Sequence, residues 1–512
     1  MFTSQHAYDE AMSLPHLRLQ IPESDLRQGA VAQMTIAATS GSYQRPWGQN
    51  GAFAVVYKFT THSGQTKALR CFRVAMPADI RERYEALRVF LATHLPENTA
   101  GFRYYHEGIL IEEHVQGGPQ RVAHAVLVMD WVRGETLLNT VHTLCREQDQ
   151  SGLARLAEQW LTLLDRMSRV HLAHGDLAGR NVLVRDDGSL VLIDYDGCYI
   201  PQFQGKSPLV NGQPDYQHPQ TNRRAFDEEM DSFSAYVIYI ALRALQLHPS
   251  LWTTYAPQDR QGTLTEDRLL FAQQDFLDPD HSPLFRDFAC TADPVLYALT
   301  QLLKCACHQP IEQMLLPPLG TALVQHLQTS APIQGDESAR GKQQAYIIGS
   351  LRYDLLRHSL HLQRSRDALR LTEQIEANEG LLPEALRGQV HEIRQQFLAS
   401  LHSDGMQASR HPQTGEVEVR WQWPDENLVR WAAVAWRTDR WPSNPCEQGT
   451  YLYHPVARGN ESSGSFRFPA PLQQRIWLQL YFALPETSPG RTMPGITWHY
   501  SESVRTSACL IE

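Results

Sequence analysis

Three polar residues that could do chemistry lie close together in the sequence. Asp176 and Asn181 are five positions apart, and Asp194 follows Asn181 after thirteen positions. Between them, the Asp187-Gly188 pair separates two apolar runs and is typical of a β-hairpin turn. Because a hairpin turns the chain back on itself, the three side chains can converge on one site. Such a site can orient a hydroxyl nucleophile and hold metal ions, as phosphoryl transfer from a nucleotide requires.

The composition describes an ordinary globular protein. Apolar residues make up 42% of the 512 residues and charged residues 20%, and this length predicts roughly two to four domains. The net charge of −10 provides no general basic field, so nucleic acid is not expected as the main partner. The most apolar segment, AYVIYIALRAL, is too short for a membrane span and contains Arg243. The first residues lack a signal-peptide pattern and the eight cysteines do not suggest a disulfide scaffold, so we expect a cytoplasmic protein.

The hydrophobic pattern predicts a small sheet with one helix, followed by a mostly helical region. Residues 1 to about 40 show no clear period. The patterns predict strands at 51–59, 66–74, 107–115 and 123–132 and helices at 77–95, 154–173 and 227–245. The last of these helices is apolar almost all round, so we expect it to be buried.

The C-terminal third has a different pattern. After a linker-like GDESAR stretch, residues 338–403 predict helices that form a hairpin or stalk. From residue 406 the period becomes two, as in the alternation of Val417, Val419 and Trp421. Several such runs punctuated by proline and glycine predict a β-sandwich over 406–512. On pattern alone it resembles a fibronectin type III module.

The chain from about residue 45 to 330 resembles a protein-kinase-like domain. The stretch HGDLAGRN is similar to the catalytic loop H-R-D-L-x-x-x-N of that family. The resemblance implies an α+β, bilobal fold, followed by the helical segment and the β-sandwich. Its parts would be an N-terminal extension at 1–40, an N-lobe at 41–133 and a C-lobe at 134–332.

The resemblance also implies roles for the polar residues. Asp176 would be the catalytic base, while Asn181 and Asp194 would hold the metal. The cofactors would be ATP and Mg²⁺ (or Mn²⁺). The implied nucleotide-binding residues are Gly51, Ala52, Phe53, Val56, Ala68, Arg70, Glu85, Met129, Asp130 and Val132.

Two upstream elements depart from the family pattern. In GQNGAFAVVYKF, Gln49 and Ala54 replace the first and third glycines of the phosphate-covering loop. In KALRCF, Arg70 stands where the family has the phosphate-binding lysine, and a guanidinium is a wider, planar fork. The acid expected to pair with it from the helix at 77–95 is Glu85, which could instead be a solvated helix acid.

The catalytic loop departs from the pattern as well. Gly175 replaces the family arginine, so we expect no phosphate-operated activation switch of that kind. Ala178 replaces the family lysine, and Arg180 could serve the transferring phosphate instead, or could simply be solvated. D-F-G becomes DYDG, in which Tyr195 can fill the packing role of the phenylalanine. Asp196 is an additional carboxylate that could help to hold metal or could cap the following turn.

The segment after DYDG favours a protein kinase over a small-molecule kinase. Gly175 and IDYD also fit phosphotransferases of the aminoglycoside and choline kinase type. However, a long loop leads to YQHPQ, which resembles the A-P-E motif with Pro219 retained. Asp231 then begins a segment that resembles the buried helix of the family. It would brace the catalytic loop, act as a helix N-cap, or do both.

The resemblance therefore implies an ATP-dependent protein kinase of the Ser/Thr type with C-terminal interaction modules. The alternatives are a nucleotide-binding pseudokinase scaffold, which Arg70 and the thinned glycine loop favour, and a small-molecule kinase. The variant looks like a group of bacterial kinase-like proteins that often accompany a metal-dependent protein phosphatase and a von Willebrand factor A-type protein. These two are the partners that the resemblance implies.

Overall fold

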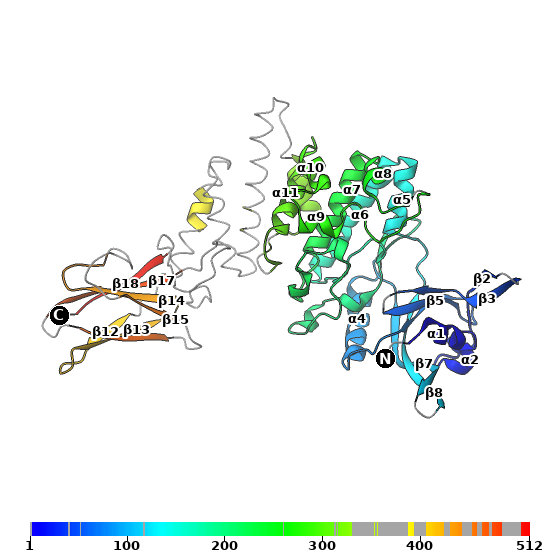
Figure 1. The fold of residues 1–512 in the computed structure, drawn as a ribbon, viewed down its shortest axis with the longest axis horizontal. Helices are drawn as coiled ribbons and strands as arrows, with labels where there is room; N and C mark the ends of the chain where they lie inside the picture. The colour runs from blue at the N-terminus through cyan, green and yellow to red at the C-terminus, as the bar shows by residue number, and fades with distance from the viewer. Residues whose placement is uncertain are drawn as a thin grey trace. The chain divides into compact units, whose positions relative to one another are not determined.

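The structure is a computed structural model, and its described residues fall into two compact units. The units are Met1–Ser330 and Ala331–Glu512 (Figure 1). The described residues are 3–38, 41–51, 53–115, 118–259, 261–311, 314, 316–329, 353, 356, 388–393, 406–423, 431–442, 453–457, 463–470, 474–483 and 503–511.

The first unit begins with an antiparallel six-stranded sheet. Its strand order is β1-β5-β6-β8-β7, with β4 paired to β5. The strands are β1 (Ala30–Val31), β4 (Gly48–Asn50), β5 (Ala54–Thr60), β6 (Thr66–Phe72), β7 (Phe102–Val115) and β8 (Gly118–Asp130). Val56 pairs with Arg70, and Ala68 pairs with Met129. The predicted helix is present as α4 (Ile80–His94), which packs against β7.

The N-terminal segment packs on the six-stranded sheet. It forms α1 (Gln5–Met12), α2 (Pro15–Arg18) and α3 (Ser24–Arg27), and β2 (Gln33–Ala38) pairs with β3 (Gly41–Pro46). Tyr8, Met12 and Ile21 are fully buried in one cluster with side chains of β5, β6, β7 and β8. The buried carboxylate of Asp9 accepts hydrogen bonds from Tyr57 Oη and Arg45 Nε, each at 2.7 Å. The sequence pattern missed this role because these helices are too short to show a period.

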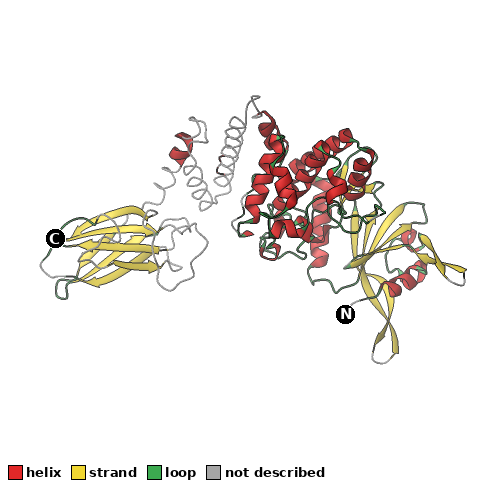
Figure 2. Ribbon diagram, turned by 45° about the horizontal axis from the view of Figure 1, so that its top comes forward, coloured by secondary structure: helices red, strands yellow, loops and turns green. Residues whose placement is uncertain are grey.

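The rest of the first unit is mostly helical (Figure 2). Its α7 (Ser232–Leu247) corresponds to the buried helix predicted from the sequence and packs against α6, α8 and α11 (Figure 1). Its Tyr236, Ile240 and Leu245 are fully buried. The helices are α5 (Leu137–Glu147), α6 (Gln150–Arg169), α7 (Ser232–Leu247), α8 (Leu251–Tyr255), α9 (Gln273–Leu277), α10 (Pro283–Ala289), α11 (Pro294–Cys307) and α12 (Thr321–Thr329). A three-stranded sheet of β9 (Glu135–Thr136), β10 (Val182–Val184) and β11 (Leu190–Leu192) carries the predicted hairpin.

The second unit contains two antiparallel sheets that share a core. One has the order β12-β13-β16 and the other β15-β14-β17-β18. The strands are β12 (Gln407–Arg410), β13 (Glu416–Gln422), β14 (Trp431–Arg437), β15 (Tyr453–Ala457), β16 (Ser463–Pro469), β17 (Ile476–Ala483) and β18 (Ser503–Ile511). Val417, Val419 and Trp421 lie in the shared cluster, as their alternation predicts. Most of the predicted helices of 338–403 lie outside the described residues, and the fibronectin type III-like module stays a prediction.

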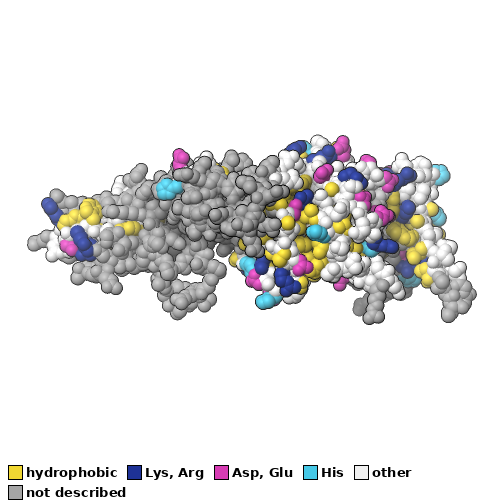
Figure 3. All heavy atoms as spheres, turned by 90° about the horizontal axis from the view of Figure 1, so that it is seen from above, with side chains coloured by type: hydrophobic (Ala, Val, Ile, Leu, Met, Phe, Trp, Pro, Cys, Tyr) yellow, Lys and Arg dark blue, Asp and Glu magenta, His cyan; other side chains and the backbone are white. Residues whose placement is uncertain are grey.

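Helix hydropathy and surface charge can be compared with the expectations from the sequence. None of the described helices is long and apolar enough to cross a membrane. On the face drawn in Figure 3, basic and acidic side chains of the first unit are interspersed with each other.

Candidate functional site

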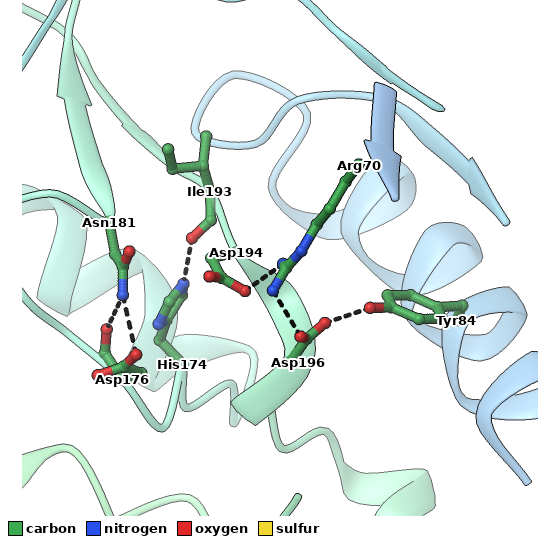
Figure 4. A network of polar contacts seen from close by, with 8 residues as sticks. All are labelled: Arg70, Tyr84, His174, Asp176, Asn181, Ile193, Asp194 and Asp196. Carbon is green, nitrogen blue, oxygen red and sulfur yellow. Dashed lines mark hydrogen bonds and ion pairs between the residues drawn. The ribbon is translucent and has the colours of Figure 1, made fainter. Parts of the chain in front are cut away.

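The site is built on the β10–β11 hairpin and on the loop before it. Asn181 Nδ2 donates to the Asp176 backbone carbonyl at 2.8 Å and to Asp176 Oδ2 at 3.0 Å. Across the hairpin, the backbone N–H of Ile193 donates to the Asn181 carbonyl at 3.0 Å. Asp194 follows directly, so the hairpin brings Asp176, Asn181 and Asp194 together, as their spacing predicts (Figure 4).

The backbone holds Asp194 in an unusual conformation. Its φ of 67° and ψ of 71° are left-handed, and only Gln148 and His171 share a positive φ among the other described non-glycine residues. Such conformations cost on the order of 1–3 kcal/mol and cluster at functional sites. The buried ring of His174 contributes to this geometry, because its Nε2 lies 2.8 Å from the Ile193 carbonyl oxygen.

Asp231 braces the catalytic loop from the start of α7. Its carboxylate accepts hydrogen bonds from the backbone N–H groups of His174 and Gly175, the latter at 2.8 Å. The side chain makes no capping bond to α7. Of the two roles considered for Asp231, the structure shows the bracing one.

The structure explains why position 175 holds glycine instead of arginine. Gly175 has a φ of +79°, and a Cβ there would collide with the carbonyl oxygen of Gly197. An arginine from a later part of the chain, Arg224, contacts this position instead. Its Nη2 donates to the Gly175 carbonyl at 2.9 Å, and its Nη1 donates to Gln217 Oε1 at 2.7 Å. A half-buried guanidinium thus ties the segment after Asp194 to the loop that contains Gly175.

A glycine substitution tests this close approach. We expect Gly175→Ala to destabilise the first unit by about 2–5 kcal/mol, because strain at positive φ adds to overpacking. Gly188→Ala is the matched control, since Gly188 has a φ of +83° with nothing within 4 Å of an added Cβ. It should cost only about 1–2 kcal/mol. Equal losses for both variants in urea unfolding would show that the contact with Gly197 does not matter.

Arg70 bridges two carboxylates in the structure. Its Nη1 donates to Asp194 Oδ1, and its Nη2 donates to Asp196 Oδ2 at 2.7 Å. Burial opposes the charged form of Arg70, but the two carboxylates outweigh it and raise the pKa of this group. Tyr84 Oη donates to the other oxygen of Asp196. Both oxygens of Asp196 therefore bind protein groups in this structure, one the guanidinium of Arg70 and the other the hydroxyl of Tyr84.

The predicted pairing of Glu85 with Arg70 is wrong. Glu85 lies on the exposed face of α4, where its carboxylate pairs with Arg88 at 2.6 Å and 3.0 Å. Its side chain keeps 61% of its surface exposed. Neighbouring helix positions point about 100° apart, so the preceding residue, Tyr84, faces the site instead.

The remaining predicted nucleotide residues lie on the sheet and its loop. Val56 on β5 pairs with Arg70 on β6, and Ala68 on β6 pairs with Met129 on β8, so the four residues lie on three adjacent strands of the sheet. In the glycine-rich loop, the Gly51 N–H donates to the Ala54 carbonyl at 2.9 Å. Phe53 is 53% exposed there. Ala52 lies outside the described residues.

Backbone N–H groups at the end of β8 form hydrogen bonds within the protein. The Asp130 N–H donates to the Gly101 carbonyl at 2.8 Å, and the Trp131 N–H donates to the Thr66 carbonyl at 3.3 Å. The Asp130 side chain pairs with Lys67 at 2.6 Å. Of the predicted nucleotide-binding residues in this segment, Asp130 thus already uses its backbone N–H and its side chain in contacts within the protein.

Arg180 is exposed, and the half-buried acid Asp267 lies beside it. Burial raises the pKa of Asp267 to about 6, while the charge and the backbone N–H of Arg180 oppose this rise. The Tyr216 hydroxyl donates to Asp267 Oδ1 at 3.3 Å. The sequence pattern missed Asp267, because it lies in an irregular stretch far from the motif.

The raised pKa of Asp267 predicts a pH dependence of stability. The unfolded chain binds fewer protons here than the folded protein between about pH 4 and pH 6, so stability rises as pH falls through this window. We expect Asp267→Asn to be more stable than wild type at about pH 8, with the difference vanishing below about pH 4. Urea unfolding at both pH values measures it. A constant difference across this range would contradict the assignment.

The segment after Asp194 contacts Asp176 directly. The Gln213 backbone N–H donates to Asp176 Oδ1 at 2.7 Å. Burial raises the pKa of the Asp176 carboxyl above its usual value, and hydrogen bonds from Gln213 and Asn181 oppose that rise. Each carboxylate oxygen has two lone pairs, so Asp176 can still accept a proton from a hydroxyl.

The donor set fits a hard divalent cation. Asp194 supplies a carboxylate and Asn181 an amide oxygen, and oxygen ligands of these kinds suit Mg²⁺ and Mn²⁺. The Asp194 side chain stays 37% exposed although one oxygen binds Arg70. The surrounding charges also fit, because the carboxylates of Asp176, Asp194 and Asp196 lie close enough to interact electrostatically with one another.

One family model matches this region. Residues 115–200 match the model of the RIO domain, and this stretch contains Asp176, Asn181 and Asp194. This part of the chain is therefore similar to a RIO domain.

Three curated protein kinases are similar to parts of this chain. The probable serine/threonine-protein kinase mkcD of Dictyostelium discoideum is 26% identical over 129 residues, which cover 24% of this chain and 19% of that protein. Serine/threonine-protein kinase PAK 1 of Mus musculus is 26% identical over 118 residues, with coverages of 23% and 21%. CBL-interacting protein kinase 4 of Oryza sativa subsp. japonica is 32% identical over 130 residues, with coverages of 24% and 28%. The chain thus spans less than a third of the length of each of these relatives.

Proposed function

We propose that the first unit is an ATP-dependent protein kinase that transfers the γ-phosphate to a protein hydroxyl, with serine or threonine as the acceptor. The observation that carries the proposal is the convergence of Asp176, Asn181 and Asp194 on one hairpin. A protein that only binds partners has no use for a base and two metal ligands in this arrangement.

Each residue has a defined task in this reaction. Asp176 accepts the proton of the acceptor hydroxyl, and its hydrogen bonds to Asn181 and Gln213 fix its orientation. Asn181 and Asp194 hold Mg²⁺, which when bound neutralises charge on the phosphates. Arg70 contacts the phosphates, and the exposed Arg180 stabilises the transferring group.

Val56, Ala68, Met129 and Val132 bind the adenine side of ATP, and Gly51, Ala52 and Phe53 lie over the phosphates. The second unit serves as an interaction module, and the expected phosphatase and von Willebrand factor A-type partners would bind there.

A pseudokinase is the second candidate, because Arg70 pairs with Asp194 in this structure and so occupies a metal ligand.

Incubation of the full chain with γ-labelled ATP, Mg²⁺ or Mn²⁺ and peptides carrying serine, threonine or tyrosine distinguishes a kinase from a pseudokinase. The kinase proposal predicts label on serine or threonine. A thermal shift with ATP but no label on peptide or chain would support the pseudokinase instead. Label on choline or an aminoglycoside alone would indicate a small-molecule kinase.

A further inference from the structure

The two carboxylates that bind Arg70 differ in their surroundings. We propose that Asp196 is the permanent counter-ion of Arg70, that Tyr84 connects this pair to α4, and that Asp194 is thereby left available for metal. Asp196 and Tyr84 would then be positioning residues that do together what an acid on α4 was expected to do. This inference rests on the proposed function for its metal-dependent part only.

Asp196 is committed to protein contacts through both oxygens. Its Oδ2 accepts from Arg70 at 2.7 Å, and its Oδ1 accepts from the Tyr84 hydroxyl. Its side chain is only 9% exposed, whereas that of Asp194 is 37% exposed. Figure 4 shows Arg70 reaching between the two carboxylates, with Asp194 on the side of Asn181 and Asp196 on the side of Tyr84. The two acids therefore have different tasks.

Tyr84 is held rigidly enough to orient the pair. Its ring stacks on Tyr104 with centroids 5.1 Å apart, and it contacts the edges or faces of Phe72 and Phe102 at 6.2 Å and 6.0 Å. The side chain is fully buried on the inner face of α4. Because the ring cannot move without disturbing these contacts, a shift of α4 would shift the hydroxyl that binds Asp196.

The pairing also prevents competition for Asp194. A buried guanidinium needs a carboxylate partner. When Asp194 binds a cation, Arg70 still has Asp196. Without Asp196, Arg70 would depend on Asp194 alone and would compete with the metal for it. Loss of Asp196 should therefore weaken metal binding indirectly, and only while Arg70 is present.

The first arm of the test needs no nucleotide. Hydrogen exchange of the α4 amides is measured in the full-length wild type and in Tyr84→Phe, Asp196→Asn and the double variant. We expect exchange to accelerate about tenfold or more in each single variant, and the double variant to add little, since both remove the same connection. Glu85→Gln on the exposed face of the same helix is the control and should exchange like wild type. Unchanged α4 exchange in both single variants would overturn the inference, whether or not ATP is turned over.

The second arm separates a counter-ion from a metal ligand. Mn²⁺ is titrated at fixed ATP, and the half-saturating metal concentration is compared in a cycle of Asp196→Asn with Arg70→Met. The inference predicts a rise of about tenfold or more for Asp196→Asn in the wild-type background and no further rise in the Arg70→Met background. An equal rise in both backgrounds would make Asp196 a metal ligand and overturn the inference. If the wild type binds no Mn²⁺–ATP, the proposed function fails, and hydrogen exchange alone decides on the inference.

Discussion

Replacing Asp176 with asparagine lowers phosphate transfer by about 10²- to 10⁴-fold and leaves ATP binding within a factor of about two, because general-base catalysis contributes in this range. Asparagine has nearly the same shape as aspartate, and its single amide oxygen can still accept from either the Asn181 amide or the Gln213 N–H, which bind different oxygens of Asp176. It cannot take up the proton of an acceptor hydroxyl. The loss should therefore appear in kcat, with the KM for ATP almost unchanged.

Asp186→Asn is the matched control, because Asp186 is exposed on the turn of the same hairpin. It should transfer phosphate like wild type. A pH profile adds a second readout. Burial raises the pKa of Asp176, so as the pH is lowered, the wild-type kcat should begin to fall at a higher pH than it would with a base that has the pKa of an ordinary aspartate. Equal rates for Asp176→Asn and wild type would show that Asp176 is not the catalytic base.

Replacing Ile21 with alanine destabilises the first unit by about 2–5 kcal/mol, as deletion of a fully buried side chain usually does. Ile21 is 0% exposed and belongs to the core between the N-terminal segment and the sheet. Its loss should loosen the strands that carry Val56 and Arg70, so ATP affinity should fall together with stability. Urea unfolding and ATP titration measure the two effects.

Leu17→Ala is the control for this prediction, because Leu17 lies in the same segment but is 58% exposed. Its effect should stay within about 0.5 kcal/mol of wild type. A small effect of Ile21→Ala, equal to that of Leu17→Ala, would show that the segment contributes little to the stability of the sheet.

The parts of the site that could be predicted are those encoded locally. The hairpin between Asn181 and Asp194 follows from an Asp-Gly turn between two apolar runs, so the spacing was enough to bring the polar residues together. The place of Arg70 was also predictable: it stands where the family has the phosphate-binding lysine, and its guanidinium lies beside Asp194 in the structure.

The parts that could not be predicted depend on contacts between distant segments. Asp196 meets Arg70 across 126 positions of sequence, and no local pattern favours this pairing over a turn cap. For α4, a shift of one position decides whether Glu85 or Tyr84 faces inward. An acidic residue was expected at the inner position, but the aromatic rings around Tyr84 bury that face instead.

The most direct test of the central claim is a crystal structure of the full chain with a non-hydrolysable ATP analogue and Mn²⁺, in which anomalous scattering locates the metal. The account predicts Mn²⁺ bound to Asn181 and Asp194, a γ-phosphate facing Asp176, and Arg70 still paired with Asp196. Metal on Asp196, or a nucleotide bound away from Asp176 with no metal on Asp194, would contradict it.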